Sequence, residues 1–195
     1  MSKNLTWLIV AGVVALAAFW CVSQYNKMVV AEENVEKQWS QVENVYQRRA
    51  DLVPQLVGAV KGYAKHESET FENVIAARAK ATQITIDPSN ATPEQLKEWQ
   101  AAQGELGSAL GRLMAITESY PELKANENFL DLQAQLEGTE NRITEARRQF
   151  NNAAQAFNVK TRLFPTNVIA SMFNFEQKGY FTANEGADVA PKVEF

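Results

Sequence analysis

Residues 5–22 read LTWLIVAGVVALAAFWCV and form an apolar segment without a charged side chain. As an α-helix this segment would be about 27 Å long, close to the roughly 30 Å of a bilayer's hydrocarbon core. Trp7 and Trp20 lie near its two ends, where indole rings favour the membrane–water interface. We therefore predict a transmembrane anchor over residues 1–24, with Trp7 and Trp20 as membrane-interface residues.

A cleaved signal peptide is the rival interpretation of the same segment. Ala15-Leu16-Ala17 would serve as a cleavage site, but the apolar run continues past it through Trp20. The run therefore favours an uncleaved, single-pass anchor. Lys3 and Lys27 bracket it with too small a charge bias to decide which side of the membrane holds the rest of the chain. Cys21, the single cysteine, excludes an intrachain disulfide, and lipidation of its thiol stays open.

The helix of the anchor is predicted to continue far beyond the membrane. No glycine or proline occurs between Val13 and Val53, and apolar residues alternate at spacings of four and three from Val35 to Tyr63. Pro54 predicts a kink rather than an end, because the pattern resumes directly after it. We predict one helix from about residue 5 to about residue 79, whose middle part is a membrane-proximal stalk.

The remaining segments predict an antiparallel helical bundle. Residues 81–91 are expected to form a loop, and Thr92 and Gln95 then make a capping box for a helix that ends near residue 118. A third helix is expected to end near Asn158, and a short fourth covers residues 167–173. The fold class is therefore all-α, with three long helices and a short fourth over residues 25–175 and an aromatic tail over residues 176–195. Three glycines in the second helix are expected to allow close helix contact: Gly104, Gly107 and Gly111.

Part of the first helix has no evident partner in this arrangement. Residues 25–80 would cover about 84 Å as a helix, but residues 93–118 only about 39 Å. With the loop at 81–91 as the distal tip, the second helix would pair only down to about Gln55. An apolar seam below that level is expected to be covered by other copies, by a partner, or by the aromatic tail. This candidate seam consists of Val35, Trp39, Val42, Tyr46 and Arg49.

Several polar residues have their own expected roles. Arg49 is expected to pack its stem in the seam and to pair with Glu118 or Glu122, with an anion site built from Arg48 and Arg49 as the alternative. Near the end of the third helix a group of asparagines is expected to bond the Phe164-Pro165 turn. That group is Asn151, Asn152 and Asn158.

Composition and motifs argue against several classes of function. The net charge of −4 and the scattered Lys and Arg residues exclude a typical nucleic-acid-binding protein. Carboxylate-bridged metal bundles need a Glu-x-x-His motif on each of two helices, whereas His66 is the only histidine. We therefore predict no enzymatic activity, no cofactor and no metal site, and we expect His66 to be a partly exposed helix residue beside Lys65 and Glu67.

Several motifs, in order along nearly the whole chain, resemble the LemA family. They are QRRADLVPQLV at 47–57, VKGYAKHE at 60–67, YPELKANENFL at 120–130, TENRI at 139–143, ARR at 146–148 and FPTNVIA at 164–170. Gln55, Gly58-Ala59, Phe150 and Phe157 depart from the family pattern. The resemblance implies a bacterial single-span protein of the inner (cytoplasmic) membrane with an antiparallel helical bundle. It implies no established activity or catalytic residue, and associates some relatives with internal membranes and others with signalling or envelope stress.

Together these observations predict a membrane-anchored, self-associating scaffold. Its expected partners are the lipid bilayer, further copies bound through the stalk, and another membrane protein that it recruits. A monomeric adaptor or regulator of a membrane protease or sensor is the alternative, and a membrane-bound enzyme is the third hypothesis.

Overall fold

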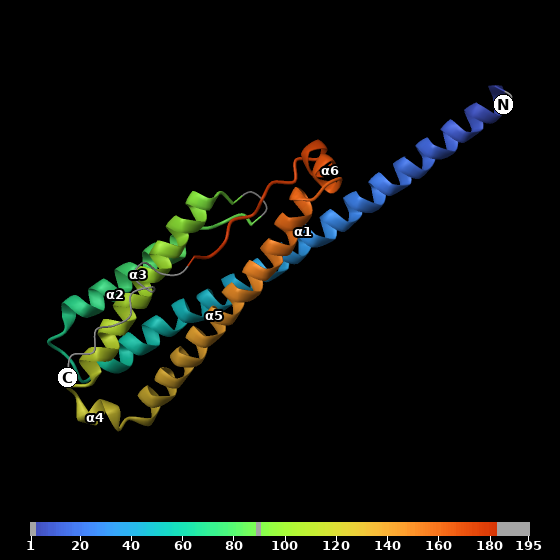
Figure 1. Cartoon of the computed structure of the whole chain (residues 1–195). Coiled ribbons are helices and arrows are strands. Elements are labelled where there is room, and N and C mark those ends of the chain that lie inside the picture. The colour runs from blue at the N-terminus through green and yellow to red at the C-terminus, as the bar shows by residue number, and fades with distance from the viewer. Residues whose placement is uncertain (1–2, 89–90, 183–195) are drawn as a thin grey trace, which may run out of the picture.

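The computed structural model describes residues 3–88 and 91–182, which form six helices and no strand (Figure 1). The all-α prediction, with a long apolar N-terminal helix, is confirmed. The helices are α1 Lys3–Lys61, α2 Ser68–Gln83, α3 Pro93–Thr117, α4 Pro121–Lys124, α5 Glu127–Arg162 and α6 Thr166–Met172.

The first helix ends earlier than predicted. It stops at Lys61, where Gly62 follows, and glycine costs roughly 1 kcal/mol in a helix interior relative to alanine. The chain then turns, with the amides of Tyr63 and Ala64 both donating to the carbonyl of Val60. A separate helix, α2, runs back along the bundle from Ser68. The distal tip therefore lies at residues 62–67 and near α4, and the prediction of a single helix to residue 79 with a tip at 81–91 is wrong.

Pro54 lies inside α1 without ending it. A proline has no N–H to donate to the carbonyl four residues earlier, which here belongs to Ala50. The Nε of Arg78, from α2, donates to that carbonyl at 2.7 Å. The neighbouring helix thus supplies the hydrogen bond that the proline removes, and α1 continues.

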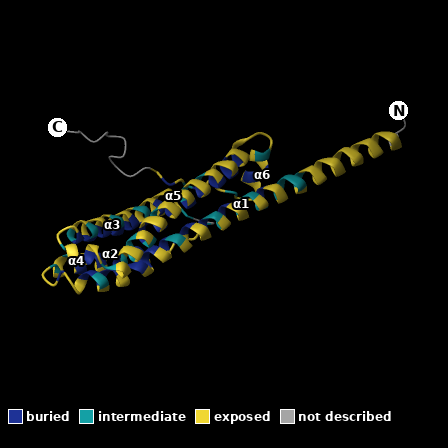
Figure 2. Cartoon of the chain, turned by 90° about the horizontal axis from the view of Figure 1, so that it is seen from below, coloured by how far each residue is buried: buried dark blue, intermediate teal, exposed yellow. Residues whose placement is uncertain are grey.

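The bundle consists of two antiparallel helix pairs. α1 lies along α5 and α2 along α3 (Figures 1 and 2). α5 is about 54 Å long and residues 25–61 of α1 about 55 Å. α5 is therefore long enough to cover all of α1 that follows the apolar segment. The end of α1 that precedes the bundle is exposed on all sides (Figure 2).

Three apolar clusters follow one another along this rod. The distal cluster joins all the long helices and includes Leu56, Val60, Leu106, Leu113 and Phe129. The middle cluster joins α1, α3, α5 and the segment after α6, and the membrane-proximal cluster joins α1 to α6.

The predicted start of α3 is confirmed, but the predicted close helix contact at its three glycines is found at only one of them. Thr92 and Gln95 form the expected capping box. Only Gly107 lies against another helix, where a Cβ would stand 3.6 Å from Nη1 of Arg49. A Cβ at Gly104 or Gly111 would meet nothing within 4 Å. Those two glycines therefore do not mediate close helix contact within the described part of the chain.

Candidate functional site

The seam on α1 is buried within its own chain. Val35, Trp39, Val42 and Tyr46 belong to the middle cluster, where α5 packs along one side and Leu96 and Trp99 of α3 close the other. Phe181, which follows α6, stacks on Trp39 at a centroid distance of 6.0 Å. The expectation that these residues lack an intrachain partner is therefore wrong, because α5 is long enough to cover them. The alternative that the aromatic tail contributes to the cover is confirmed for Phe181.

Arg49 is the polar centre of this seam. Its side chain is 4% exposed, and its Nη2 donates to the backbone oxygen of Gln103 at 2.9 Å and to its Oε1 at 2.8 Å. Its Nη1 pairs with Glu140 of α5 at 3.2 Å, and Gln103 in turn donates to the carbonyl of Ala81. One guanidinium on α1 thus links α3 and α5. The expected partners Glu118 and Glu122 are not used, because they lie at the distal turn, away from this level.

A polar cleft of about 360 Å³ opens above Arg49 between α3 and α5. Its walls carry Gly104, Ser108 and Thr144, together with Glu140 and Arg147. The guanidinium of Arg49 lies 4.8 Å from the ring centroid of Tyr46 at its floor. Burial raises the pKa of Tyr46, although the charges of Arg147 and Arg49 oppose that shift.

The segment after α6 is held by asparagine side chains of α5. Asn158 donates to the carbonyl of Lys178 and accepts from its amide, both at 2.8 Å, and Asn151 makes the same pair of bonds with Phe181 at 2.9 Å. The expected bonds from these asparagines to the Phe164-Pro165 turn are not made. Sequence reasoning missed this role because bonds to an irregular segment follow no periodic pattern. Residues 183–195 of the predicted tail lie outside the described residues.

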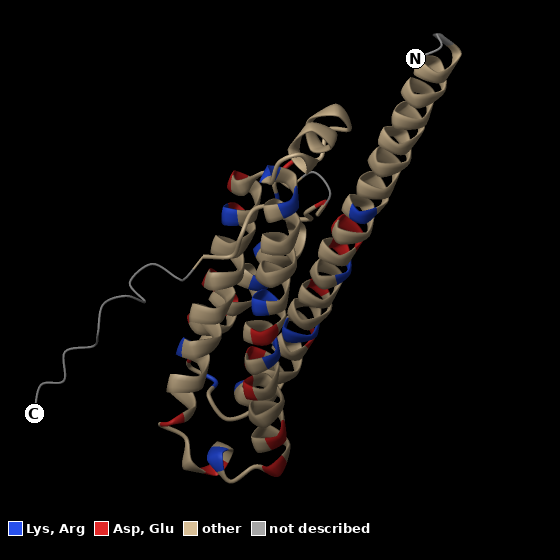
Figure 3. Cartoon of the chain, turned by 45° about the vertical axis from the view of Figure 1, so that its right-hand side comes forward, with Lys and Arg blue, Asp and Glu red and all other residues tan. Residues whose placement is uncertain are grey.

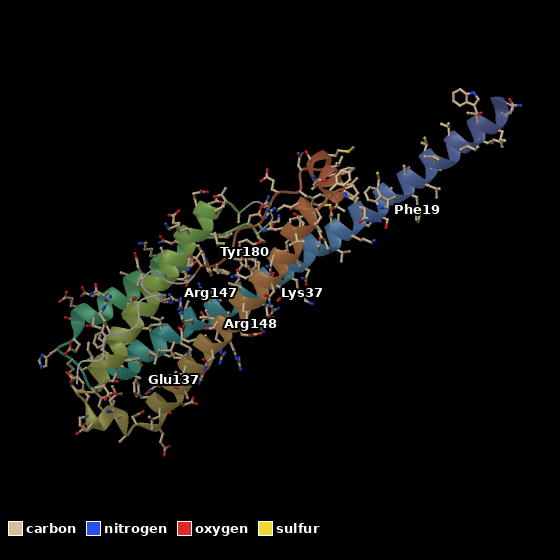
Figure 4. The ribbon with its side chains drawn as sticks, in the orientation of Figure 1. Phe19, Lys37, Glu137, Arg147, Arg148 and Tyr180 are labelled. Carbon is tan, nitrogen blue, oxygen red and sulfur yellow. The ribbon has the colours of Figure 1, made fainter. Side chains whose placement is uncertain are left out.

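The membrane-proximal end of α1 has the length and composition to cross a bilayer. Trp7 is 74% exposed and Trp20 37% exposed, and Phe19 projects from the part of α1 that extends past the bundle (Figure 4). Just beyond the apolar segment, Met28 is buried against Ile169 and Ala170 of α6, with Cys21 and Tyr25 packed on the same cluster. The bundle therefore packs on α1 immediately next to the apolar segment.

The chemistry-bearing residues do not converge. Among the described residues, no group of three or more His, Cys, Asp or Glu side chains is placed to hold a metal ion. His66 is exposed beside Lys65 and Glu67, but it lies in the turn between α1 and α2 and not in a helix as predicted, because α1 ends at Lys61 before Gly62. It is far along the chain from Cys21 and from the Arg49 cleft. The anion site from Arg48 and Arg49 is not formed, because Arg48 points to Gln135 at the surface.

Comparison with known proteins assigns the chain to a family. The model of the LemA family matches residues 38–195. Two Magnetosome proteins MamQ of Paramagnetospirillum magneticum are 28% identical to it, over 93% of this chain and 74% of theirs. Protein LemA of Metamycoplasma hominis is 26% identical, over 86% of this chain and 73% of its own length. The family match includes Trp39, the residues of the Arg49 cleft and α6, and the chain belongs to the LemA family.

Proposed function

We propose that this protein is a membrane-anchored helical scaffold that holds its bundle in a fixed position on the bilayer, where it organises the membrane or recruits partners. The observation that carries the proposal is the continuity of α1. One helix contains both the apolar segment and the seam at the centre of the bundle. A flexible linker would let a domain diffuse around its anchor, whereas here a continuous helix joins the bundle to the apolar segment.

Contacts around the membrane-proximal end of the bundle support this rigid attachment. Tyr25 packs on Phe173 and Phe175 with ring centroids 4.7 and 5.7 Å apart. Lys178, which is buried, pairs with Glu32 of α1 at 2.7 Å. These contacts brace α1 on the residues that directly follow its apolar segment, so bending there would cost buried packing.

A scaffolding role rather than catalysis is part of the proposal. The polar residues of the seam are used to join helices, with Arg49 bonded to Gln103 and Glu140. The names of the relatives, Magnetosome protein and Protein LemA, describe no enzyme. We retain self-association as part of the proposal, through surfaces outside the seam, because the seam residues are covered by their own chain.

A monomeric adaptor of a membrane protease or sensor is the second candidate. The closure of the seam within one chain favours it, because the bundle core needs no second copy, and the open cleft above Arg49 offers a surface to a partner. The mass of the full-length protein in detergent separates the two candidates. A defined multimer supports the scaffold, and a monomer that gains one copy of a captured membrane protein supports the adaptor.

The rigid attachment itself is tested by an insertion. A flexible Gly-Ser linker placed after Ser23 would uncouple the bundle from the anchor, whereas the same linker after His66, in the exposed distal turn, would leave the attachment intact. The orientation of the bundle relative to the membrane would be measured by cryo-electron microscopy of reconstituted vesicles. We expect one uniform orientation in the wild type and in the control insertion, and variable orientations in the insertion after Ser23. Equal orientation in both variants would refute the proposal that rigidity is the working property.

A further inference from the structure

The end of the bundle nearest the anchor exposes a group of large apolar side chains. Phe164 is 83% exposed, Met172 68% and Leu163 58%. With Val168 and Phe173, which are half exposed, they lie on the turn between α5 and α6 and on the outer face of α6. We call these five residues the apolar end. Contiguous apolar surface of this kind usually marks an interface with a protein or a membrane.

The apolar end is not surface left over from poor packing of α6. The opposite face of that helix is well buried, with Ile169 and Ala170 nearly inaccessible against Met28 of α1. One face of α6 is therefore buried in the bundle, and its other face is apolar and exposed.

The position of the apolar end along α1 matches the edge of the anchor's apolar segment. α5 runs antiparallel to α1, so its last turn and α6 lie beside the first part of α1 outside the anchor (Figure 1). Lys160, in that last turn, lines the same hollow as Phe19 and Val22. Leu163 and Phe164 follow Lys160 in the direction of the anchor. A bilayer around residues 5–22 would therefore have its surface at the level of the apolar end.

The charged residues that flank the apolar end most closely in sequence are basic, whereas Glu32 and Glu176 come further along their segments. Residues 160–175 contain Lys160 and Arg162 but no Asp or Glu, and the first charged residue of α1 after the apolar segment is Lys27. α6 itself carries no charged residue (Figure 3). Apolar side chains bordered by Lys and Arg are typical of segments that lie in the headgroup region of anionic membranes.

A hollow beside the anchor has the same mixed character. It measures about 450 Å³ and is lined by Phe19, Val22 and Val30, with Lys27 and Lys160 at its polar side. Apolar side chains of this kind are a surface on which acyl chains pack, and ammonium groups pair with phosphate.

We propose that the apolar end is a second lipid contact of this protein. Phe164, Leu163 and Met172 enter the boundary between headgroups and acyl chains, and Lys27, Lys160 and Arg162 bind the phosphates of anionic lipids. The inference rests on the proposed function in one respect, namely that residues 5–22 cross the bilayer. It adds that the bundle touches the membrane at two points, the anchor and α6, which fixes its tilt as well as its distance.

The test uses the full-length protein with single cysteines in a Cys21→Ser background, labelled with an environment-sensitive fluorophore. Phe164→Cys reports on the apolar end. Leu16→Cys, 72% exposed on the anchor, and Leu130→Cys, half exposed at the distal start of α5, are the matched controls. Each variant is reconstituted in vesicles of phosphatidylcholine and phosphatidylglycerol that contain nitroxide-labelled lipid.

We expect the label at 164 to show blue-shifted emission and strong loss of intensity to the lipid nitroxide, and the label at 130 to show neither. If the label at 164 behaves like that at 130 while the label at 16 is quenched, the second lipid contact is overturned and the anchor stands. If the label at 16 also escapes quenching, the anchor fails, and the inference fails with it. Shielding of the label at 164 in native membranes but not in pure lipid would overturn the lipid assignment in favour of a protein partner.

The role of the cations has a separate arm. Removing phosphatidylglycerol is expected to reduce quenching at 164, and the triple variant Lys27→Gln, Lys160→Gln, Arg162→Gln is expected to lose that dependence on lipid charge. An undiminished dependence in the triple variant would overturn the assignment of these three residues to the phosphates.

Discussion

Replacing Trp39 by alanine removes the ring at the centre of the middle cluster. Trp39 is 2% exposed and packs on Trp99, Phe150 and Phe181 at centroid distances of 5.3, 5.4 and 6.0 Å. A buried Trp→Ala change typically costs about 3–5 kcal/mol of unfolding free energy. Because these neighbours occupy three different parts of one chain, collapse around the cavity is restricted. We therefore expect a loss near the upper half of that range.

Trp39→Phe is the informative companion of this variant. The indole Nε1 of Trp39 is buried without a hydrogen-bond partner among the described residues, and an orphaned buried donor costs about 1–3 kcal/mol. Phenylalanine loses part of the packing but removes that penalty, so we expect Trp39→Phe to cost clearly less than Trp39→Ala. Val30→Ala, exposed on the same helix, is the control and should stay within about 0.5 kcal/mol of wild type.

The assay is urea unfolding of the full-length protein in detergent, followed by far-ultraviolet circular dichroism at two protein concentrations. Seam contacts made within one chain predict a cost of Trp39→Ala that does not depend on protein concentration, whereas seam contacts shared between copies make that cost change with concentration. A loss below about 1 kcal/mol for Trp39→Ala, well under the usual cost of a buried large-to-small change, would refute the intrachain burial of the seam. A cost of Trp39→Ala that changes with protein concentration would refute it equally.

Three further predictions concern particular contacts, each checked by the same unfolding assay unless stated. Arg78→Met leaves the Ala50 carbonyl without a donor and should lower the unfolding free energy by about 1.5–3 kcal/mol. The loss should be much smaller in a Pro54→Ala background, because alanine restores the helical N–H. Purely additive losses would show that the two sites are not coupled. Asn158→Ala removes both bonds to the Lys178 backbone and should speed proteolysis at residues 176–182, unlike the exposed neighbour Asn152→Ala; equal rates would contradict the pinning. The buried Tyr46 has a raised pKa in the folded state, so its contribution to stability is complete below the unfolded value near 10 and falls as pH rises above it. Tyr46→Phe should flatten that alkaline loss, and an unchanged pH profile would contradict the assignment.

Much of the local structure of this protein can be predicted from its sequence. The uncharged run at residues 5–22 identifies a helix that could span a membrane, and the capping box of Thr92 and Gln95 identifies the start of α3. The apolar periodicities identify the buried faces of the helices. Each of these signals lies within a few turns of chain, where helix geometry alone decides what is adjacent.

The order of the helices in space was harder to predict, because it depends on one turn. Apolar spacing continues across Gly62 through Phe71 and Val74, so the pattern does not reveal that the chain reverses there. Moving the tip from residues 81–91 to residues 62–67 adds a helix to the bundle and lets α5 lie along the whole stalk. With the tip at residues 62–67, Val35, Trp39 and Val42 are core residues, whereas a tip at residues 81–91 leaves them without a partner helix.

Polar contacts between distant segments were also beyond the sequence pattern. Arg49 was recognisable as a buried cation, but Glu140 becomes its partner only through the register of α1 against α5. The bond from Arg78 to Ala50 likewise needs α2 to return beside Pro54. Such contacts follow from topology and register, which a periodic pattern does not encode.

Hydrogen exchange across the exit of α1 from the bilayer tests the central claim most directly. Mass spectrometry would follow the backbone amides of residues 23–31 in the full-length protein held in lipid nanodiscs. A continuous helix, braced there by α6, predicts slow exchange comparable with that of residues 40–50 in the bundle core. Rapid exchange confined to residues 23–31 would reveal a hinge between anchor and bundle, and would contradict the account of this protein as one rigid rod standing on the membrane.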